Sequence, residues 1–398
     1  MFPPVAETRA ASRARYGAVT FVLVWCAVAV VSSLYVALPM IDFFAERFQA
    51  SAELAAWTSS GFSLTYAFGF LLAAPLSERY GTWPVMLAGL IGLAVVTPLI
   101  GLMDSLPGVV AMRAAQGLTA ATFAPNALTY IAEVYPAERR VSVIGFVSAG
   151  FLLAGIVGQA FGVLVLRTMG WPAGFLLLGA VYSLSALLLG LMSPRAGRRE
   201  ATGGYWDVYR QIGRLFRNRA LLFCYAVALT LFLTFIGMYA ALGSLLSAPP
   251  FSLDDGQILL VRAAGIFGML LSPFTGKLAA RFGLPAMLKS GLLLAISGMT
   301  ALCAAPGLAV LAPASIVFVA GISVMIPTLV ALTGQIADRT RGAAMTLYSF
   351  ILFVGATLGP LVSLSLMQAG GQLLAFAALA LLLVGAFACA AFLSASGR

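Results

Sequence analysis

The sequence has 398 residues, of which 62% are apolar and only 9% are charged, and its mean hydropathy is +1.03. These values exclude an ordinary soluble globular domain and indicate a membrane protein. The formal net charge is +10, but the basic residues lie mostly in short segments between apolar runs, which favours a role in membrane orientation over nucleic-acid binding.

The first apolar run follows a basic segment, as in a signal peptide. Residues 19–38 are too long for a signal-peptide core, and Pro39 and acidic residues follow in place of a small-residue cleavage site. We therefore expect the first membrane span here. Charged and Gly/Pro clusters divide the chain into twelve segments long enough to span a bilayer. These segments are 17–39, 54–75, 84–103, 107–132, 141–166, 172–193, 220–247, 257–275, 286–304, 309–334, 343–368 and 372–395.

The fourth segment contains a charged residue, Arg113, inside an otherwise uncharged helix. A charge that faces lipid would cost several kcal/mol, so we expect this side chain to face a wet cavity or a polar partner. Gln116 and Gly117 follow at i+3 and i+4, on the same helix face. Two interpretations stay open: Arg113 binds an anionic substrate, or it bonds backbone carbonyl groups of the first span.

Residues 193–219 form the longest hydrophilic connection and contain seven arginines. We interpret it as a linker, with residues 206–216 (WDVYRQIGRLF) as an amphipathic helix at the membrane surface. The predicted domains are an N-terminal six-helix bundle (1–193), a cytoplasmic linker (194–219) and a C-terminal six-helix bundle (220–398).

Arg262 is the second charge inside a predicted span, and it mirrors Arg113 in the other half of the chain. No Asp, Glu or Lys lies in the centre of any predicted span. Two arginines without intramembrane carboxylates predict an electropositive cavity that favours an anionic substrate. The alternative is that Arg262 extends outward to Asp254 or Asp255.

The basic residues predict the orientation of the chain. With both termini on the cytoplasmic side, 19 Lys and Arg residues fall in inside segments and two, Arg47 and Arg167, fall in outside loops. Abundant Arg and Ala with almost no Lys are typical of GC-rich bacterial coding, so we expect a bacterial inner membrane.

The two halves of the sequence repeat at an offset of 202 residues. Residues 74–81 (APLSERYG) align with 276–283 (GKLAARFG), Pro125 aligns with Pro327, and Arg139 aligns with Arg341. This agreement indicates an internal duplication, and repeated halves in membrane proteins usually flank a transport path.

Three motifs make the chain similar to the major facilitator superfamily, and in particular to its twelve-helix drug:proton antiporter (efflux) branch. The loop motif G-x-L-[AS]-[DE]-R-x-G-R-[RK] is kept in part at residues 74–83, and R-x-x-Q-G is intact at 113–117. The exporter motif G-x-x-x-G-P-x-x-G-G is kept in part at 154–162, where Gln159 replaces its proline, and it has an echo at 355–360. The resemblance implies an all-α membrane protein with twelve transmembrane helices in two pseudo-symmetric six-helix bundles.

The resemblance also implies a cytoplasmic gate, in which Arg79 pairs with Glu133 and Glu78 approaches the start of the eleventh helix. Glycines at 150, 155, 158 and 162 line one side of the fifth helix, either for tight packing or as an interface that opens and closes. The predicted gating and motif residues are Glu78, Arg79, Gly81, Glu133, Gly158, Gly162, Arg281, Gly359 and Pro360.

By the same resemblance, helices 1, 4, 7 and 10 line the cavity, with helices 2 and 5 at its flanks. The predicted substrate-binding residues are Arg113, Gln116, Arg262, Tyr35, Asn126, Tyr130, Tyr66, Phe235, Tyr239 and Gln159, and Thr230, Thr234 and Thr328 also lie on these helices. Aromatic faces with sparse polar groups suit a partly apolar ligand.

The sequence therefore predicts a secondary transporter that exports a small amphipathic or anionic compound by alternating access, with protons as the coupling ion. The alternative is an importer or exchanger of an organic anion, such as a carboxylate metabolite or siderophore. We expect no enzyme activity, because the sequence has no nucleotide-binding loop and no His, and its four Cys, at 26, 224, 303 and 389, are scattered. We expect no cofactor, no metal, no nucleic acid, and a monomer in the lipid bilayer.

Overall fold

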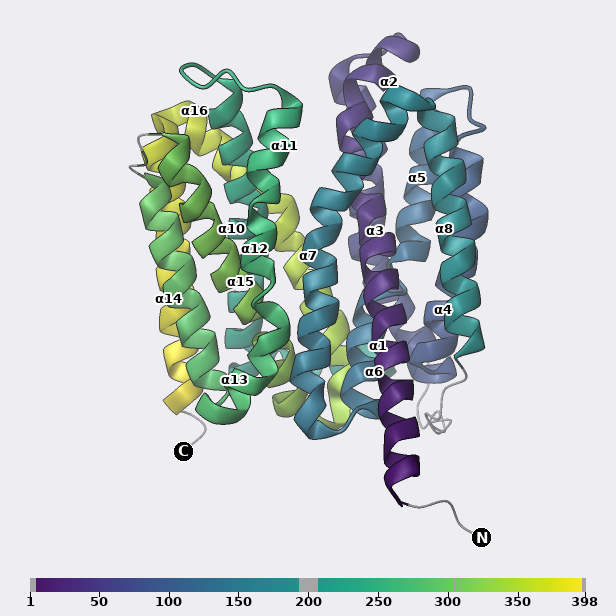
Figure 1. The fold of residues 1–398 in the computed structure, drawn as a ribbon, viewed down its shortest axis with the longest axis vertical. Helices are drawn as coiled ribbons and strands as arrows, with labels where there is room; N and C mark the ends of the chain where they lie inside the picture. Colours follow the sequence, from purple (N-terminus) through teal and green to yellow (C-terminus); the bar gives the residue numbers. More distant parts are fainter. Residues whose placement is uncertain (1–4, 193–206, 304, 306, 396–398) are drawn as a thin grey trace.

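The computed structural model describes residues 5–192, 207–303, 305 and 307–395. Long helices run side by side along one axis, and both ends of the chain lie at the same end of the molecule (Figure 1). The helices of the first half are α1 (Val5–Tyr35), α2 (Ile41–Arg47), α3 (Ala52–Tyr80), α4 (Thr82–Ile100), α5 (Leu106–Ala120), α6 (Ala124–Val134), α7 (Ala137–Thr168) and α8 (Trp171–Leu191). After α9 (Asp207–Leu215) follow α10 (Arg219–Ser247), α11 (Asp255–Ala263), α12 (Gly265–Met269), α13 (Thr275–Phe282), α14 (Leu284–Cys303), α15 (Leu308–Ala337) and α16 (Arg341–Ala395), with short 3₁₀ turns at Leu38–Met40, Ser272–Phe274 and Asp338–Thr340.

Ten helices in the described part of the chain are long and apolar enough to cross a membrane. The fourth predicted span is divided into α5 and α6 by a turn at residues 121–123, next to Pro125, which has no amide N–H to donate. The eleventh and twelfth spans run together as the 55-residue α16, which turns at Gly370 and Gly371, where φ and ψ are not helical. The expected all-α, twelve-helix membrane fold is thus confirmed.

The internal duplication is visible in the backbone. Gly81 ends α3 with φ +88°, and Gly283, 202 residues later, ends α13 with φ +81°. Both glycines are followed at once by the next helix, and this region of φ is strained for any residue with a side chain. The duplication is not complete, because Pro327 lies inside an unbroken α15 whereas its counterpart Pro125 begins α6.

The glycine motifs pack helices inside each half. A β-carbon added at Gly158 of α7 would lie 2.5 Å from the carbonyl oxygen of Ser32 in α1, so the two backbones touch. Gly359 of α16 has the same relation to Leu233 of α10, also at 2.5 Å. The structure therefore supports the tight-packing interpretation of this motif, because its neighbours belong to the same half of the molecule.

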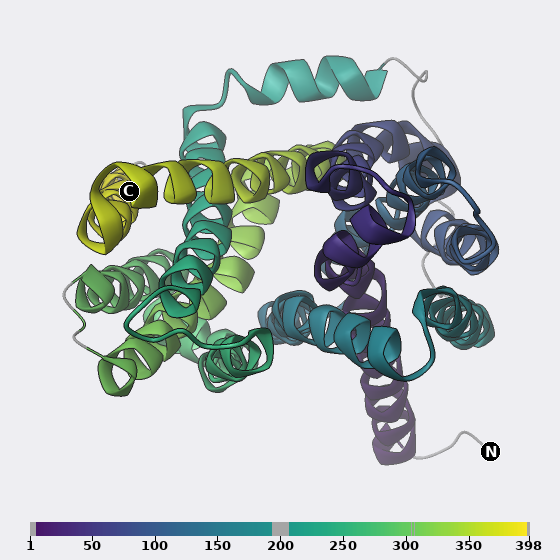
Figure 2. The same ribbon diagram turned by 90° about the horizontal axis from the view of Figure 1, so that it is seen from above.

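The helix predicted in the linker is present as α9. Seen from above, it lies across the outside of the molecule beside both sets of helices (Figure 2). The Tyr209 hydroxyl donates to the carbonyl oxygen of Leu71 in α3 at 3.3 Å, and Leu215 is buried. The predicted boundary at residues 193 and 194 lies outside the described residues, whereas the second boundary agrees with the start of α10 at Arg219.

The two halves touch at the end of the molecule that carries both termini (Figure 1). The Ser272 hydroxyl donates to the carbonyl oxygen of Gly145 at 2.9 Å, and a β-carbon at Gly276 would meet the backbone nitrogen of Ser142 at 2.6 Å. Backbones this close leave no path between α7 and the start of α13. This end of the molecule is closed.

Candidate substrate cavity

A cavity of about 180 Å³ lies between the two halves, away from the closed end. Its walls come from α1 and α7 of the first half and from α10, α11, α12 and α16 of the second. The lining residues are Tyr35, Leu38, Leu152, Gly155, Ile156, Gln159, Phe235, Ile236, Tyr239, Ala240, Arg262, Met269 and Pro360. Most of these side chains are apolar, and the polar ones lie close together around Arg262.

The Arg262 side chain is held in place by contacts with both halves. Its Nη1 donates to Oε1 of Gln159 in α7 at 3.0 Å, and its Nη2 donates to the carbonyl oxygen of Tyr239 in α10 at 3.0 Å. Gly243 leaves room for the guanidinium group, because a β-carbon at that position would collide with Nη2. The arginine is therefore preorganised at the cavity wall.

The alternative for Arg262 is an extended side chain that pairs with Asp254 or Asp255, and the described contacts give Asp254 another role. Asp254 caps α11, and its Oδ1 accepts from the Gln257 backbone N–H at 2.9 Å while Gln257 returns a bond to the Asp254 backbone. The carboxylate thus satisfies the start of its own helix. The side chain of Asp255 lies outside the described part of the structure.

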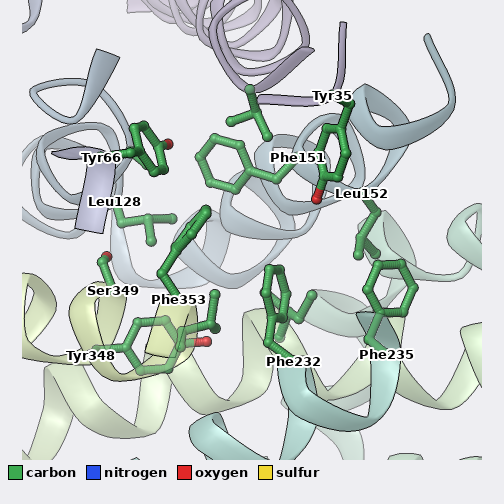
Figure 3. Close-up of a pocket in the computed structure, with 14 residues that line it drawn as sticks. Tyr35, Tyr66, Leu128, Phe151, Leu152, Phe232, Phe235, Tyr348, Ser349 and Phe353 are labelled. Atoms are coloured by element: carbon green, nitrogen blue, oxygen red, sulfur yellow. The ribbon is translucent and has the colours of Figure 1, made fainter. Parts of the chain in front are cut away.

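A smaller cavity of about 40 Å³ adjoins the larger one and shares Tyr35, Leu152 and Phe235 with it. Side chains of the first half face those of the second across it (Figure 3). Its other lining residues are Val31, Tyr66, Ala124, Leu128, Phe151, Phe232, Ile326, Tyr348, Ser349, Leu352 and Phe353. Among the described residues that line the two cavities, Arg262 is the one charged side chain.

Aromatic rings connect the halves across the smaller cavity. The ring of Tyr66 meets that of Phe353 edge to face, with centroids 4.7 Å apart, and Phe70 lies 5.3 Å from the same ring. In the larger cavity Phe235 meets Tyr239 edge to face at 5.2 Å. Edge-to-face packing stabilises aromatic pairs, and the exposed ring faces can receive an apolar ligand.

Arg113 does not line either cavity, which corrects its prediction as a substrate-binding residue. It is fully buried, its Nε donates to the Thr58 carbonyl at 2.8 Å, and its Nη1 donates to the Ser33 carbonyl at 2.9 Å. Nη1 also bonds Gln116, and the guanidinium carbon lies 4.5 Å from the centroid of the Phe62 ring. Nε and Nη1 thus bond α1, α3 and the arginine's own helix, while the buried Nη2 has no hydrogen-bond partner among the described residues, so Arg113 joins three helices of one half.

Three further predicted residues also lie outside the two cavities. Gln116 is fully buried and donates to the Thr97 hydroxyl at 2.9 Å, as the second member of the Arg113 network. Asn126 donates to the Thr122 carbonyl at 2.6 Å, and Tyr130 is buried with its ring 4.9 Å from that of Trp83. These side chains pack inside the first half because the turn between α5 and α6 directs this face away from the centre.

The predicted gating residues have different roles in this structure. The Glu78 carboxylate lies at the start of α16, where a β-carbon at Gly342 would be 2.6 Å from its Oε1, beside the helix N-terminus that the sequence analysis expects it to approach. Arg79 lies over the ring of Tyr80 at 5.5 Å, and its pairing with Glu133, an exposed residue near the end of α6, stays a prediction. Arg281, its counterpart in the second half, lies over Phe282 at 5.3 Å.

Sequence reasoning missed several aromatic residues of the smaller cavity, namely Phe151, Phe232, Tyr348 and Phe353. Each lies in a helix that is apolar on every side, so its sequence contains no periodic signal for the face that points to the centre. The sequence analysis did identify six residues that line the cavities: Tyr35, Tyr66, Gln159, Phe235, Tyr239 and Arg262.

Comparison with known proteins agrees with this architecture. The family model for the Major Facilitator Superfamily matches residues 20–269. An uncharacterised MFS-type transporter of Bacillus subtilis, YceJ, is 27% identical over 329 residues, which cover 81% of this chain and 82% of that protein. A tetracenomycin C resistance and export protein of Streptomyces glaucescens is 30% identical over 152 residues, 38% of this chain and 28% of that protein.

A solved structure of the proton:xylose symporter XylE has the same fold. It superposes with a TM-score of 0.74 at 16% identity and covers 94% of this chain and 95% of that one. The match of the family model over more than half of the sequence, together with the two packed halves and the cavity between them, identifies a multi-pass membrane transport protein. The chain belongs to the major facilitator superfamily.

Proposed function

We propose that this transporter exports a small organic compound that combines an anionic group with an apolar, aromatic-compatible body. The observation that supports the proposal is the charge of the cavity: Arg262 lies on a wall of apolar and aromatic side chains, with no carboxylate among the described residues that line it. A positively charged group on the cavity wall attracts an anion and repels a cation.

The geometry of Arg262 allows a ligand to bind without a rearrangement of the other side chains that line the cavity. Its Nη1 donates to a neutral amide oxygen of Gln159, and a ligand carboxylate is a stronger acceptor for the same N–H because the bond is then charge-assisted. The bond to the Tyr239 carbonyl keeps the guanidinium oriented during this exchange.

Alternating access is proposed as rocking of the two halves about this cavity. In the present structure the end with both termini is closed by contacts of Gly145 with Ser272 and of Ser142 with Gly276. With the termini in the cytoplasm, as the basic residues predict, this is an outward-facing arrangement. Opening of the same contacts would expose the cavity to the cytoplasm.

Export into the outside medium, from the inner membrane of a bacterium, is the proposed direction. It is supported by the partial exporter motif at residues 154–162 and by the likeness to a protein named for tetracenomycin C resistance and export.

Protons are the proposed coupling ion. Since no carboxylate is among the residues that line the cavities, the proposed proton sites are the rim acids Asp42 and Glu133 or the substrate itself.

A second candidate is import or exchange of an organic anion. The same observation favours it, because a cavity lined by an arginine and no carboxylate is suited to binding an anion without a dedicated proton site. Uptake into proteoliposomes with and without a pH gradient distinguishes the two. Equal rates with and without the gradient, together with counterflow of an unlabelled anion, would support exchange and contradict proton-driven export.

The anion site is tested with Arg262→Gln. We expect binding of aromatic carboxylates to weaken by about 30-fold, since a hydrogen bond to a charged group contributes about 2 kcal/mol, whereas neutral compounds of the same shape keep their affinity. Arg167→Gln, at an exposed arginine near the end of α7, is the control and should change neither. Equal loss for charged and neutral compounds would show that Arg262 is structural.

A further inference from the structure

The smaller cavity contains two hydrogen-bond donors that the rest of the structure does not use. The hydroxyl groups of Tyr66 and Tyr348 are buried, with residue exposures of 1% and 2%, and neither has a hydrogen-bond partner within the described part of the chain. By contrast, the buried Tyr182 donates to the Ala29 carbonyl at 3.2 Å, and the buried Tyr225 donates to the Ala344 carbonyl at 3.4 Å. Buried hydroxyl groups are normally paired, so two unpaired ones on one cavity need a reason.

Both phenols lie on the cavity wall and come from opposite halves of the transporter. Tyr66 is on α3 and Tyr348 is on α16, and Figure 3 shows each oxygen on the side of its ring that faces the other labelled side chains. Otherwise the wall consists mainly of aromatic and aliphatic groups. A ligand in this cavity therefore meets apolar surface, the two buried unpaired O–H donors, and the hydroxyl groups of Tyr35 and Ser349.

We infer that the smaller cavity is a subsite for a carbonyl oxygen on an aromatic ligand body, with the hydroxyl group of Tyr66 or of Tyr348 as its donor. The inference rests on the proposed function for the anionic end of the ligand. The adjoining larger cavity holds that end at Arg262, and Phe235 and Tyr35 line both cavities at their junction. The substrate class is an aromatic carboxylate that also carries a keto group.

Neutral ketones suit these donors better than a second charge does. A phenol O–H gives one hydrogen bond and supplies no charge, so a carboxylate in this apolar cavity would lose its hydration without compensation. A carbonyl oxygen accepts the bond at a smaller desolvation cost. Because both halves line the cavity, a ligand that binds in it contacts both moving parts of the transporter.

The test compares four probes on the purified full-length protein by calorimetry: 9-fluorenone-2-carboxylate, fluorene-2-carboxylate and the two corresponding carboxamides. The ketone and the hydrocarbon differ only in the replacement of CH₂ by C=O. We expect the fluorenone compounds to bind about fivefold tighter, the value of one net neutral hydrogen bond. This preference should vanish in one of the two single variants, Tyr66→Phe or Tyr348→Phe, and in the double variant, while the affinity for fluorene compounds stays unchanged.

Tyr182→Phe is the matched control, since it removes a buried hydroxyl group that is already bonded and lies outside the cavities. It should keep the ketone preference. Its unliganded melting temperature should fall, whereas Tyr66→Phe and Tyr348→Phe should keep or raise theirs.

Each outcome decides one part of the assignment. Ketone preference that persists in the double variant, or its absence in the unsubstituted protein because water already satisfies the hydroxyl groups, overturns the carbonyl subsite. Carboxylates that bind no better than carboxamides overturn the anionic end of the proposed function, and the ketone comparison within the carboxamide pair then still tests the subsite. Failure of all four probes to bind overturns both.

Discussion

The two buried arginines look equivalent in the sequence but differ in what surrounds their guanidinium groups. Arg113 donates to two backbone carbonyls and to Gln116 within one half, whereas Arg262 donates across the halves to Gln159. A guanidinium group that is fully buried among the helices of one half is out of reach of a ligand in the two cavities. A charge that is held by a neutral amide side chain on the other half can exchange that partner.

Substitution of Arg113 should therefore reduce stability rather than specificity. Arg113→Met leaves the Ser33 and Thr58 carbonyls and Gln116 without their donor in a dry interior, and we expect a loss of about 3 kcal/mol in the free energy of unfolding. Thermal unfolding in detergent measures this loss, with Arg167→Gln as the near-neutral control. A melting temperature equal to that of the unsubstituted protein, together with changed ligand selectivity, would show that Arg113 contributes to ligand binding.

A second prediction at the residue scale concerns Gln159, where one substitution should lower the affinity for the ligand and another should not. Gln159→Glu places a carboxylate next to Arg262 and should lower the affinity for an aromatic carboxylate at least tenfold by occupying and neutralising the guanidinium. Gln159→Ala removes the acceptor that a ligand has to displace, so its affinity should be equal or higher. Calorimetry with fluorene-2-carboxylate measures both, and similar losses in the two variants would contradict the exchange at Arg262.

At the scale of helices, the glycine motifs decide how closely neighbouring helices approach. Gly158 and Gly162 of α7 lie against the Ser32 and Val36 carbonyls of α1, and Gly355 and Gly359 of α16 lie in the same way against Leu229 and Leu233 of α10. In a membrane, where lipid is as apolar as a helix surface, such close backbone packing supplies much of the association energy. The motif therefore builds each half as a rigid unit.

The corresponding prediction compares two glycines that face different surroundings. Gly158→Ala puts a methyl group 2.5 Å from a carbonyl oxygen of α1 and should cost about 2 kcal/mol through displaced helices. Gly385→Ala in α16, where no atom lies within 4 Å, should be neutral or stabilise the helix by about 0.5 kcal/mol. Melting temperatures of the two variants test the pair, and equal values would show that α7 and α1 can separate without cost.

At the scale of the whole molecule, a transporter needs two states that differ little in free energy. The structure shows one of them, with the halves in backbone contact at the end that bears the termini and a cavity between them further along. Glu78 at the start of α16 adds an electrostatic contact at the same end. Because these contacts are few and local, a bulky side chain at one of them should disfavour this state.

The variant Gly276→Val tests the balance in free energy between the two states of the transporter. Its side chain would occupy the space of Ser142, so the closed end should open and the population should move toward the opposite state. Spin labels at Glu138→Cys and Arg281→Cys, on exposed positions of the two halves at this end, report the change by pulsed electron resonance. We expect a longer mean distance in Gly276→Val than in the Gly385→Ala control. An unchanged distance distribution would show that this contact does not hold the end closed.

Much of this architecture follows from the sequence alone. Twelve apolar segments, the repeat at an offset of 202 residues and the R-x-x-Q-G motif predict the family fold, because span length and backbone satisfaction in lipid leave few alternatives to a helix bundle. Gly81 and Gly283 have a positive φ, which favours glycine. This requirement depends only on the residue and its neighbours in the chain, so the loop motif predicts it. Arg262, Gln159 and Tyr239 were found because polar residues are rare inside such spans.

The tertiary structure decided which of these residues share a cavity. Arg113 and Arg262 occupy similar positions in the sequence of their halves, but the rotation of each helix and the turn after α5 place one inside a bundle and the other on the wall between bundles. Likewise, Tyr348 and Phe353 lie in an apolar stretch of α16 that gives no hint of its inward face. Helix formation and membrane insertion depend on neighbouring residues, so the sequence by itself determined the fold. The rotation of each helix depends on contacts between segments far apart in the chain, so only the three-dimensional packing determined the site.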